Sequence, residues 1–294
     1  MNNLHIVTVV NESKYYYPYL VESCKRNGKE LEVLGYGDKW EKGNMTKFKL
    51  MIDYLQNLPK DDIVCFVDGY DVICCRDLSE LKDEFLKINK NTNCKIIIGY
   101  DVKSGFFNFF SKIVFGECNN YLINSGLYIG YANDLLEIIQ NVFSLYKDKT
   151  VSDQVALTQY CNMSDINDFY IDSKNEFFCN IMATLEDISK YVNIDQKNNI
   201  LTYNSNKPFF IHAPGFGYLD TIIIKFGYNI KESNEIKKQI FNNVIKKSIP
   251  FILIGIKKNI LYILAFIILI ILIIYICKNY KKILKKTYLI KIIR

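Results

Sequence analysis

Two aspartates directly follow an apolar run in the segment Ile63-Val-Cys-Phe-Val-Asp68-Gly-Tyr-Asp71. The run predicts a buried strand, so both carboxylates are expected at its carboxyl end. Carboxylate oxygens are ligands that Mg²⁺ and Mn²⁺ prefer, and these ions also bind phosphate oxygens. A solvated turn is the alternative, because Asp and Gly are common turn residues. The spacing therefore makes Asp68 and Asp71 candidate metal ligands.

A second strand-like run enters a loop at Pro208-Phe-Phe-Ile-His212-Ala-Pro-Gly215. A lone histidine is more often a satisfied polar group than a ligand. His212 nevertheless shares the strand-end position of the two aspartates, which makes it a candidate third ligand and favours Mn²⁺. The other histidine, His5, precedes the first strand-like run and is interpreted as structural.

Two further motifs carry the neutral amide and carboxylate groups that sugar hydroxyls require. Asn124-Ser-Gly interrupts an apolar run, and Asp153-Gln opens a helical pattern. Each motif is commonplace, and Ser152-Asp153-Gln is also a plain helix N-cap. The only tryptophan, Trp40, follows a Gly-rich segment, where it is expected either to stack on a base or to pack on its neighbours.

Strands that alternate with helices are predicted to position these groups. Such alternation indicates a mostly parallel sheet with helices on both faces and ligands at the carboxyl ends of the strands. The segment 101–121 is poorly periodic and is interpreted as a mobile flap. Strand-like runs occupy residues 6–10, 32–36, 63–67, 95–100, 122–131 and 209–212, and helical periodicity occupies residues 48–55, 81–88 and 135–143.

The charge changes abruptly along the chain. The 294 residues carry a net charge of +6, but residues 236–294 hold 13 basic and no acidic residues, which leaves −7 on the first 235. The basic excess is therefore confined to the C-terminal stretch, and a uniformly basic nucleic-acid-binding domain is excluded. Nucleic acid is not expected as a partner.

The segment Asn259–Cys277 has no charged residue, Gly or Pro and is flanked by lysines. A helix of this length spans about 28 Å, close to the hydrocarbon thickness of a bilayer, so a transmembrane helix is predicted. We expect a domain at 1–235, a basic amphipathic linker at 236–258, the membrane helix at 259–277 and a basic tail at 278–294. No secretory signal precedes residue 6, so the large domain is expected on the cytosolic side. The lysines after the span favour the opposite orientation.

Nine cysteines are present, with no C-x-x-C pair and no zinc-binding spacing. Buried, reduced thiols in a cytosolic domain are the expectation.

The motifs, taken in order, resemble the glycosyltransferase domain of the procollagen lysyl hydroxylases and the related collagen and viral glycosyltransferases. The resemblance covers roughly residues 4–230. It rests most on Leu34-Gly-Tyr-Gly-Asp-Lys-Trp40 and Phe66-Val-Asp-Gly-Tyr-Asp-Val-Ile73. Further matching segments are Lys47, Asn124-Ser-Gly, Asp153-Gln, Asp172-Ser-Lys, Phe178-Cys-Asn180 and Ile211-His-Ala-Pro-Gly215.

The resemblance implies an α/β fold of the GT-A type, a Rossmann-like mixed sheet flanked by helices, that binds a UDP-sugar with Mn²⁺ or Mg²⁺. The metal would offset charge that builds on the UDP leaving group. The implied roles are metal ligation by Asp68, Asp71 and His212, stacking on uracil by Trp40 and Tyr70, and donor binding by Lys47, Asn180 and Gly215. The implied catalytic residues are Asn124 and Asp153, which would contact the donor sugar or the acceptor, with Asp153 positioning or deprotonating the acceptor hydroxyl.

The sequence departs from the family pattern in three places. Residues 212–215 replace a His-Gly-Asn-Gly run that a lysine usually follows, and residues 146–152 replace an aspartate-rich run. The hydroxylase domain is absent, so hydroxylation is not expected of this chain and a collagen acceptor is an analogy.

We therefore expect a glycosyltransferase that moves glucose or galactose from a UDP-sugar to a hydroxyl, hydroxylysine of a collagen-like protein being one candidate acceptor. The alternatives are a membrane-tethered glycosyltransferase acting on a glycan or glycolipid, and a non-catalytic module that binds nucleotide sugars.

Overall fold

The structure is a computed structural model, and it describes residues 2–39, 45–102, 106–147, 151–165, 167–183, 185–197, 200–214, 217–230, 233–243 and 246. Residues Met1–Ile245 form one compact unit, and Lys246–Arg294 form a second. No helix in the described ranges combines the length and apolar character needed to cross a bilayer. The predicted membrane helix at 259–277 and the basic tail lie outside these ranges.

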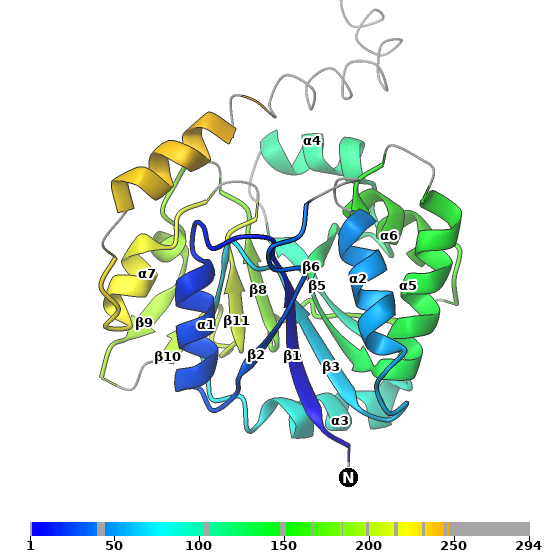
Figure 1. Ribbon diagram of the computed structural model, residues 1–294. Helices are drawn as coiled ribbons and strands as arrows, with labels where there is room; N and C mark the ends of the chain where they lie inside the picture. Colours follow the sequence, from blue (N-terminus) through cyan, green and yellow to red (C-terminus); the bar gives the residue numbers. More distant parts are fainter. Residues whose placement is uncertain are drawn as a thin grey trace, which may run out of the picture. The chain divides into compact units, whose positions relative to one another are not determined.

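A mixed sheet forms the centre of the first unit (Figure 1). Its strand order in the described chain is β2-β1-β3-β6-β5-β8-β11-β4, with β7 paired to β5. Strands β3 and β5 both pair antiparallel to β6, as β4 does to β11, and the remaining pairs are parallel. The strands are β1 Leu4–Val9, β2 Leu31–Leu34, β3 Ile63–Val67, β4 Val72–Cys74, β5 Ile96–Val102, β6 Ile123–Tyr131, β7 Phe169–Ile171, β8 Phe178–Ile181 and β11 Phe210–His212; β9 Asn193–Asp195 and β10 Ile200–Thr202 form a separate pair.

Helices cover both faces of this sheet, as the alternating pattern predicts (Figure 1). Every side chain of β3 is buried, and successive residues point to opposite faces. Phe66 packs in a cluster with α2 and α5, whereas Val67 packs in a cluster with α1 and α3. The helices are α1 Tyr17–Arg26, α2 Met45–Leu55, α3 Leu81–Thr92, α4 Phe106–Phe115, α5 Ala132–Tyr146, α6 Asp153–Cys161 and α7 Asp220–Lys225, with a 3₁₀ turn at Ile188–Tyr191.

Residues 233–243 are also helical, and they lie across the predicted domain boundary at residue 235. Ile236 and Ile240, one helical turn apart, are buried in a hydrophobic cluster with α7. This segment therefore belongs to the same compact unit as the sheet.

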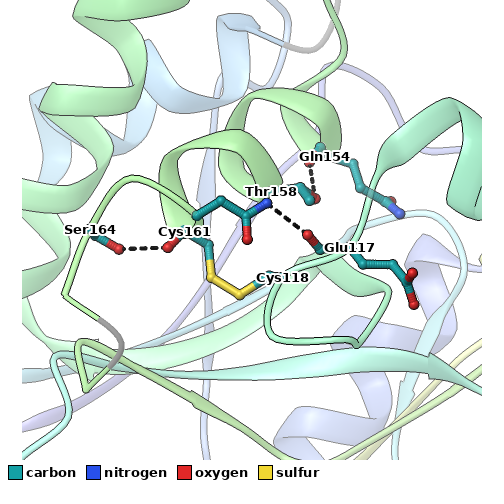
Figure 2. Close-up of a disulfide and its surroundings, with 7 residues drawn as sticks. Glu117, Cys118, Gln154, Thr158, Cys161 and Ser164 are labelled. Carbon is teal, nitrogen blue, oxygen red and sulfur yellow. Dashed lines mark hydrogen bonds between the residues drawn. A yellow bond between two sulfur atoms is a disulfide. The ribbon is translucent and has the colours of Figure 1, made fainter.

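The segment interpreted as a flap, residues 101–121, contains the helix α4, Phe106–Phe115, which the sequence reasoning did not identify; its mobility stays a prediction. One expectation from the sequence is wrong. Cys118 and Cys161 form a disulfide that links the segment after α4 to the end of α6, so these two thiols are not reduced (Figure 2). Their Cα atoms lie 5.9 Å apart, within the usual range for a disulfide. The other cysteines in the described chain are free and buried.

Candidate active site

Three predicted metal ligands meet at one edge of the sheet. Asp68 follows β3, Asp71 precedes β4 and His212 ends β11, and one ligand atom from each lies within 4.8 Å of the others. The Nε2 atom of His212 is 3.1 Å from Asp71 Oδ1 and 4.0 Å from Asp68 Oδ2. The geometry predicted from strand-end positions is therefore present among the described residues.

The orientation of the His212 ring favours a cation at this point. Its Nδ1 lies 2.8 Å from Asn180 Oδ1, and because that oxygen can only accept, Nδ1 carries the proton. A neutral His212 then turns the lone pair of Nε2 toward the carboxylates, and this buried nitrogen has no hydrogen-bond donor. Acceptor atoms at such distances need a proton or a metal between them. The donor set of two carboxylates and one imidazole is one that divalent cations accept.

Charge couples the three groups. Burial lowers the pKa of His212, but Asp71 and Asp68 outweigh this effect and hold the pKa above its usual value. Burial raises the pKa of Asp68, and the opposing effects of Lys47 and His212 are smaller. A bound divalent cation would stabilise the ionised carboxylate and the neutral imidazole together.

The packing of the site requires a glycine at position 126. A Cβ atom on Gly126 would lie 2.3 Å from Asp68 Oδ2 and 2.8 Å from His212 Cε1. The carbonyl of Gly126 accepts the backbone N–H of Asp68 and fixes the start of the loop. In Asn124-Ser-Gly, the glycine therefore leaves room for two of the candidate metal ligands.

Lys47 forms the second part of the site. It rises from α2 and is only 5% exposed. Its ammonium group forms ion pairs with Asp153, at the start of α6, and with Asp68 at 3.3 Å. It also donates to the carbonyl of Ser125 at 3.1 Å, while the Ser125 hydroxyl donates to Asp153 at 2.8 Å.

This ion-paired network fixes the protonation of its members. Burial lowers the pKa of Lys47, but Asp153 and Asp68 more than offset it and raise the pKa above its usual value. Burial raises the pKa of Asp153, but Lys47 and Ser125 outweigh it and lower the pKa below its usual range. Asp153 is therefore a carboxylate with little tendency to take a proton.

Asp101 is a site residue that the sequence reasoning missed. It is buried on β5, where its Oδ1 accepts the Asn124 amide at 2.8 Å and its Oδ2 accepts the Gln154 amide at 3.5 Å. Asn124 in turn accepts the backbone N–H of Gly126. Asn124, predicted to contact substrate, thus orients Asp101. The signal was available, because Asp101 directly follows the run 95–100.

Tyr70 lies in the loop Asp68–Asp71, which connects β3 to β4 and is called the metal loop below. Its hydroxyl donates to Asn11 Oδ1 at 2.7 Å and accepts the backbone N–H of Asn11 at 3.1 Å. The ammonium of Lys14 is 4.8 Å from the centroid of its ring. Asn180, predicted in the donor-binding set, bonds to His212 and to the carbonyl of Tyr100. The predicted residues Trp40 and Gly215 lie outside the described residues.

Comparison with known proteins identifies related chains. The family described as PLOD GT domain matches residues 1–238. A multifunctional procollagen lysine hydroxylase and glycosyltransferase of Caenorhabditis elegans is 25% identical over 287 residues, covering 85% of this chain and 37% of that protein. A procollagen-lysine,2-oxoglutarate 5-dioxygenase of Drosophila melanogaster is 24% identical over 238 residues, covering 74% and 31%. The chain thus spans about a third of the length of these relatives.

A solved structure is also similar. It is a glycosyltransferase involved in the glycosylation of the major capsid of PBCV-1, with a TM-score of 0.46 and 13% identity, covering 76% of this chain and 98% of that one.

Proposed function

Because this chain belongs to the PLOD GT domain family and is a glycosyltransferase, we propose that it transfers glucose or galactose from a UDP-sugar to a hydroxyl acceptor. The observation that carries the proposal is the cluster of Asp68, Asp71 and His212 beside the Lys47–Asp153 ion pair. A cation site next to fixed charged groups suits the departure of a nucleoside diphosphate. The fold that we infer for this chemistry is of the GT-A type.

Asp68, Asp71 and His212 would hold Mn²⁺, with Mg²⁺ as an alternative. When bound, the metal would supply positive charge against the diphosphate. The protein's own contribution is orientation: Asn180 fixes the His212 ring, and Gly126 leaves room for both side chains. These contacts hold the ligand atoms in place before the ion arrives.

The donor would lie between the metal loop and Asp101. Tyr70, with Trp40, would stack on the uracil, because its ring is anchored through Asn11. Asp101 is oriented by the amides of Asn124 and Gln154, and a carboxylate oxygen accepts more than one hydrogen bond. It would therefore accept hydrogen bonds from sugar hydroxyls.

Asp153 would orient the acceptor hydroxyl. Its lowered pKa makes it a weak base, whereas a carboxylate is a strong hydrogen-bond acceptor. Lys47 holds it in place and also contacts Asp68. The two residues thus connect the acceptor side of the site to the metal side.

The acceptor that we propose is a protein hydroxyl such as hydroxylysine, by analogy with the names of the relatives. A glycan or glycolipid acceptor at a membrane is the second candidate, and the apolar segment 259–277 favours it. Membrane attachment through that segment, and the side on which the domain lies, belong to this second proposal.

One assay tests donor, metal and turnover together. The full chain is incubated with a panel of UDP-sugars and Mn²⁺, and released UDP is measured with and without hydroxylysine peptides. We expect release from UDP-glucose or UDP-galactose that is lost on chelation and in Asp71→Ala. The matched control is Asp77→Ala, an exposed aspartate beyond the far end of β4. Release of UDP that does not require metal, or no release from any UDP-sugar, would contradict the proposal.

A further inference from the structure

The helix at residues 233–243 is held to the domain by polar contacts as well as by apolar packing (orange in Figure 1). Lys237 forms an ion pair with Asp220 at 2.8 Å, and the Ser233 hydroxyl donates to the same carboxylate at 2.9 Å. At the other end of the helix, the Asn243 amide donates to the hydroxyl of Tyr15. These bonds fix the helix at both ends.

Asp220 connects this helix to the loop between β1 and α1. Its side chain is 4% exposed, and its other oxygen accepts the hydroxyl of Tyr16 at 2.9 Å. Tyr16 itself is fully buried in the cluster that contains Ile236 and Ile240. A buried carboxylate with three partners holds each of them in a defined position, because an unsatisfied charge there is unfavourable.

The same loop supports Tyr70. The backbone N–H of Tyr16 donates to the carbonyl of Tyr70 at 3.2 Å, and the ring of Tyr15 meets the ring of Tyr70 edge-on at 5.7 Å. Lys14, the preceding residue, places its ammonium over both rings. Tyr15 therefore contacts both Tyr70 and the helix 233–243. Tyr16 contacts both Tyr70 and Asp220.

The backbone of Tyr15 makes this support necessary. Its φ of 51° is in the left-handed region, which a tyrosine rarely occupies because its Cβ is crowded there. Such a conformation persists when the surrounding contacts hold it in place. The bond from Asn243 is one of these contacts.

We infer that the helix 233–243 is a positioning element for the donor nucleotide: through Tyr15, Tyr16 and Asp220 it holds Tyr70 in the orientation that stacks on the base. This inference rests on the proposed function, because the role of Tyr70 belongs to it. Tyr70 touches the base and not the bond that breaks. Loss of the helix contacts should therefore weaken donor binding and change the rate of sugar transfer from the bound donor very little.

The test uses two matched pairs of variants in the full chain. Lys237→Met and Asn243→Ala each remove one bond from the helix to the loop network. Lys238→Met and Asn242→Ala are their controls, since these exposed neighbours form no ion pair or hydrogen bond with the described chain. Lys237→Arg keeps the ion pair and should restore wild-type behaviour.

We expect Lys237→Met and Asn243→Ala to raise the KM for the UDP-sugar about five-fold or more, with kcat changed by less than about two-fold. The Kd for UDP with Mn²⁺, measured by calorimetry, should rise in parallel, while the control variants and Lys237→Arg match the wild type. A thermal melt identifies any variant that fails to fold. Asn243→Ala removes a single bond at the helix end and keeps the test valid if Lys237→Met unfolds.

The outcomes separate the two proposals. Unchanged KM and Kd in folded Lys237→Met and Asn243→Ala would overturn the inference, and so would a fall in kcat alone. Weaker UDP binding in these variants would support it even if no sugar were transferred, in which case the proposed function fails and the inference stands. A wild-type chain that binds no UDP would overturn both.

Discussion

The disulfide between Cys118 and Cys161 gives a prediction with a calculable size. It closes a loop with a sequence separation of 43. In the chain-entropy treatment, closing a loop of that length removes enough freedom from the unfolded chain to stabilise the fold by about 4 kcal/mol at 25 °C. Removing the bond should therefore lower the free energy of unfolding by about that amount.

The perturbation is the set Cys118→Ala, Cys161→Ala and the double variant, measured by urea unfolding of the full chain. Each single variant already breaks the bond, so all three should lose nearly the same stability. Two independent buried cysteines would instead give additive losses. Peptide mapping without reduction should find the linked pair in the wild type.

The same bond should also affect the site. It anchors the carboxyl end of α6 (Figure 2), and Asp153 is the first residue of that helix. We expect treatment with a thiol reductant to lower turnover as well as stability. Additive losses in the single variants, or alkylation of both cysteines in the unreduced native chain, would refute the reasoning.

Four further predictions concern single groups in or near the site. Lys47→Met should destabilise the chain by about 3–5 kcal/mol in urea unfolding, because a buried carboxylate loses its partner, and adding Asp153→Asn should recover most of that loss. Gly126→Ala should weaken Mn²⁺ binding about ten-fold or more by spin-resonance titration, since the new methyl group would collide with two ligands. Asp101→Asn should lower kcat with the UDP-sugar about ten-fold or more and leave the Kd for UDP unchanged; a matching loss of UDP affinity would refute its assignment to the sugar. Burial raises the pKa of Asp172 to about 6, so ionising it weakens the fold. Between about pH 4 and pH 7 the wild type should thus lose about 2 kcal/mol relative to Asp172→Asn, and parallel stability curves would contradict this.

Regular apolar runs made much of the sheet predictable. The run at Ile63–Val67 gave β3 with the right bounds, because it is continuous and ends at an aspartate. The strand β4, Val72–Cys74, was missed since three residues carry no periodicity and its partner β11 is remote in sequence. A strand this short forms because neighbouring elements position it, so the local sequence pattern does not predict it.

The candidate site, like the sheet, was predictable only in part. The ends of the parallel strands β3 and β11 bring Asp68 and His212 to a common edge, and Asp71 reaches the same edge because it precedes the antiparallel strand β4. No residue pattern showed that Lys47 is buried against Asp153, since a lysine on a helix is usually solvated. Cysteine spacing likewise does not reveal a pairing between distant segments.

The position of β11 has a consequence for how the chain folds. It is the last strand of the sheet to be synthesised, yet it lies between β8 and β4. Until it emerges, β4 has no pairing partner in the described sheet, and the two aspartates of the metal loop lack their histidine. Contacts between such distant segments form slowly. A nascent chain that stops before β11 would therefore carry both acids without an assembled site, so a cation held by all three side chains could assist only the final stage of folding.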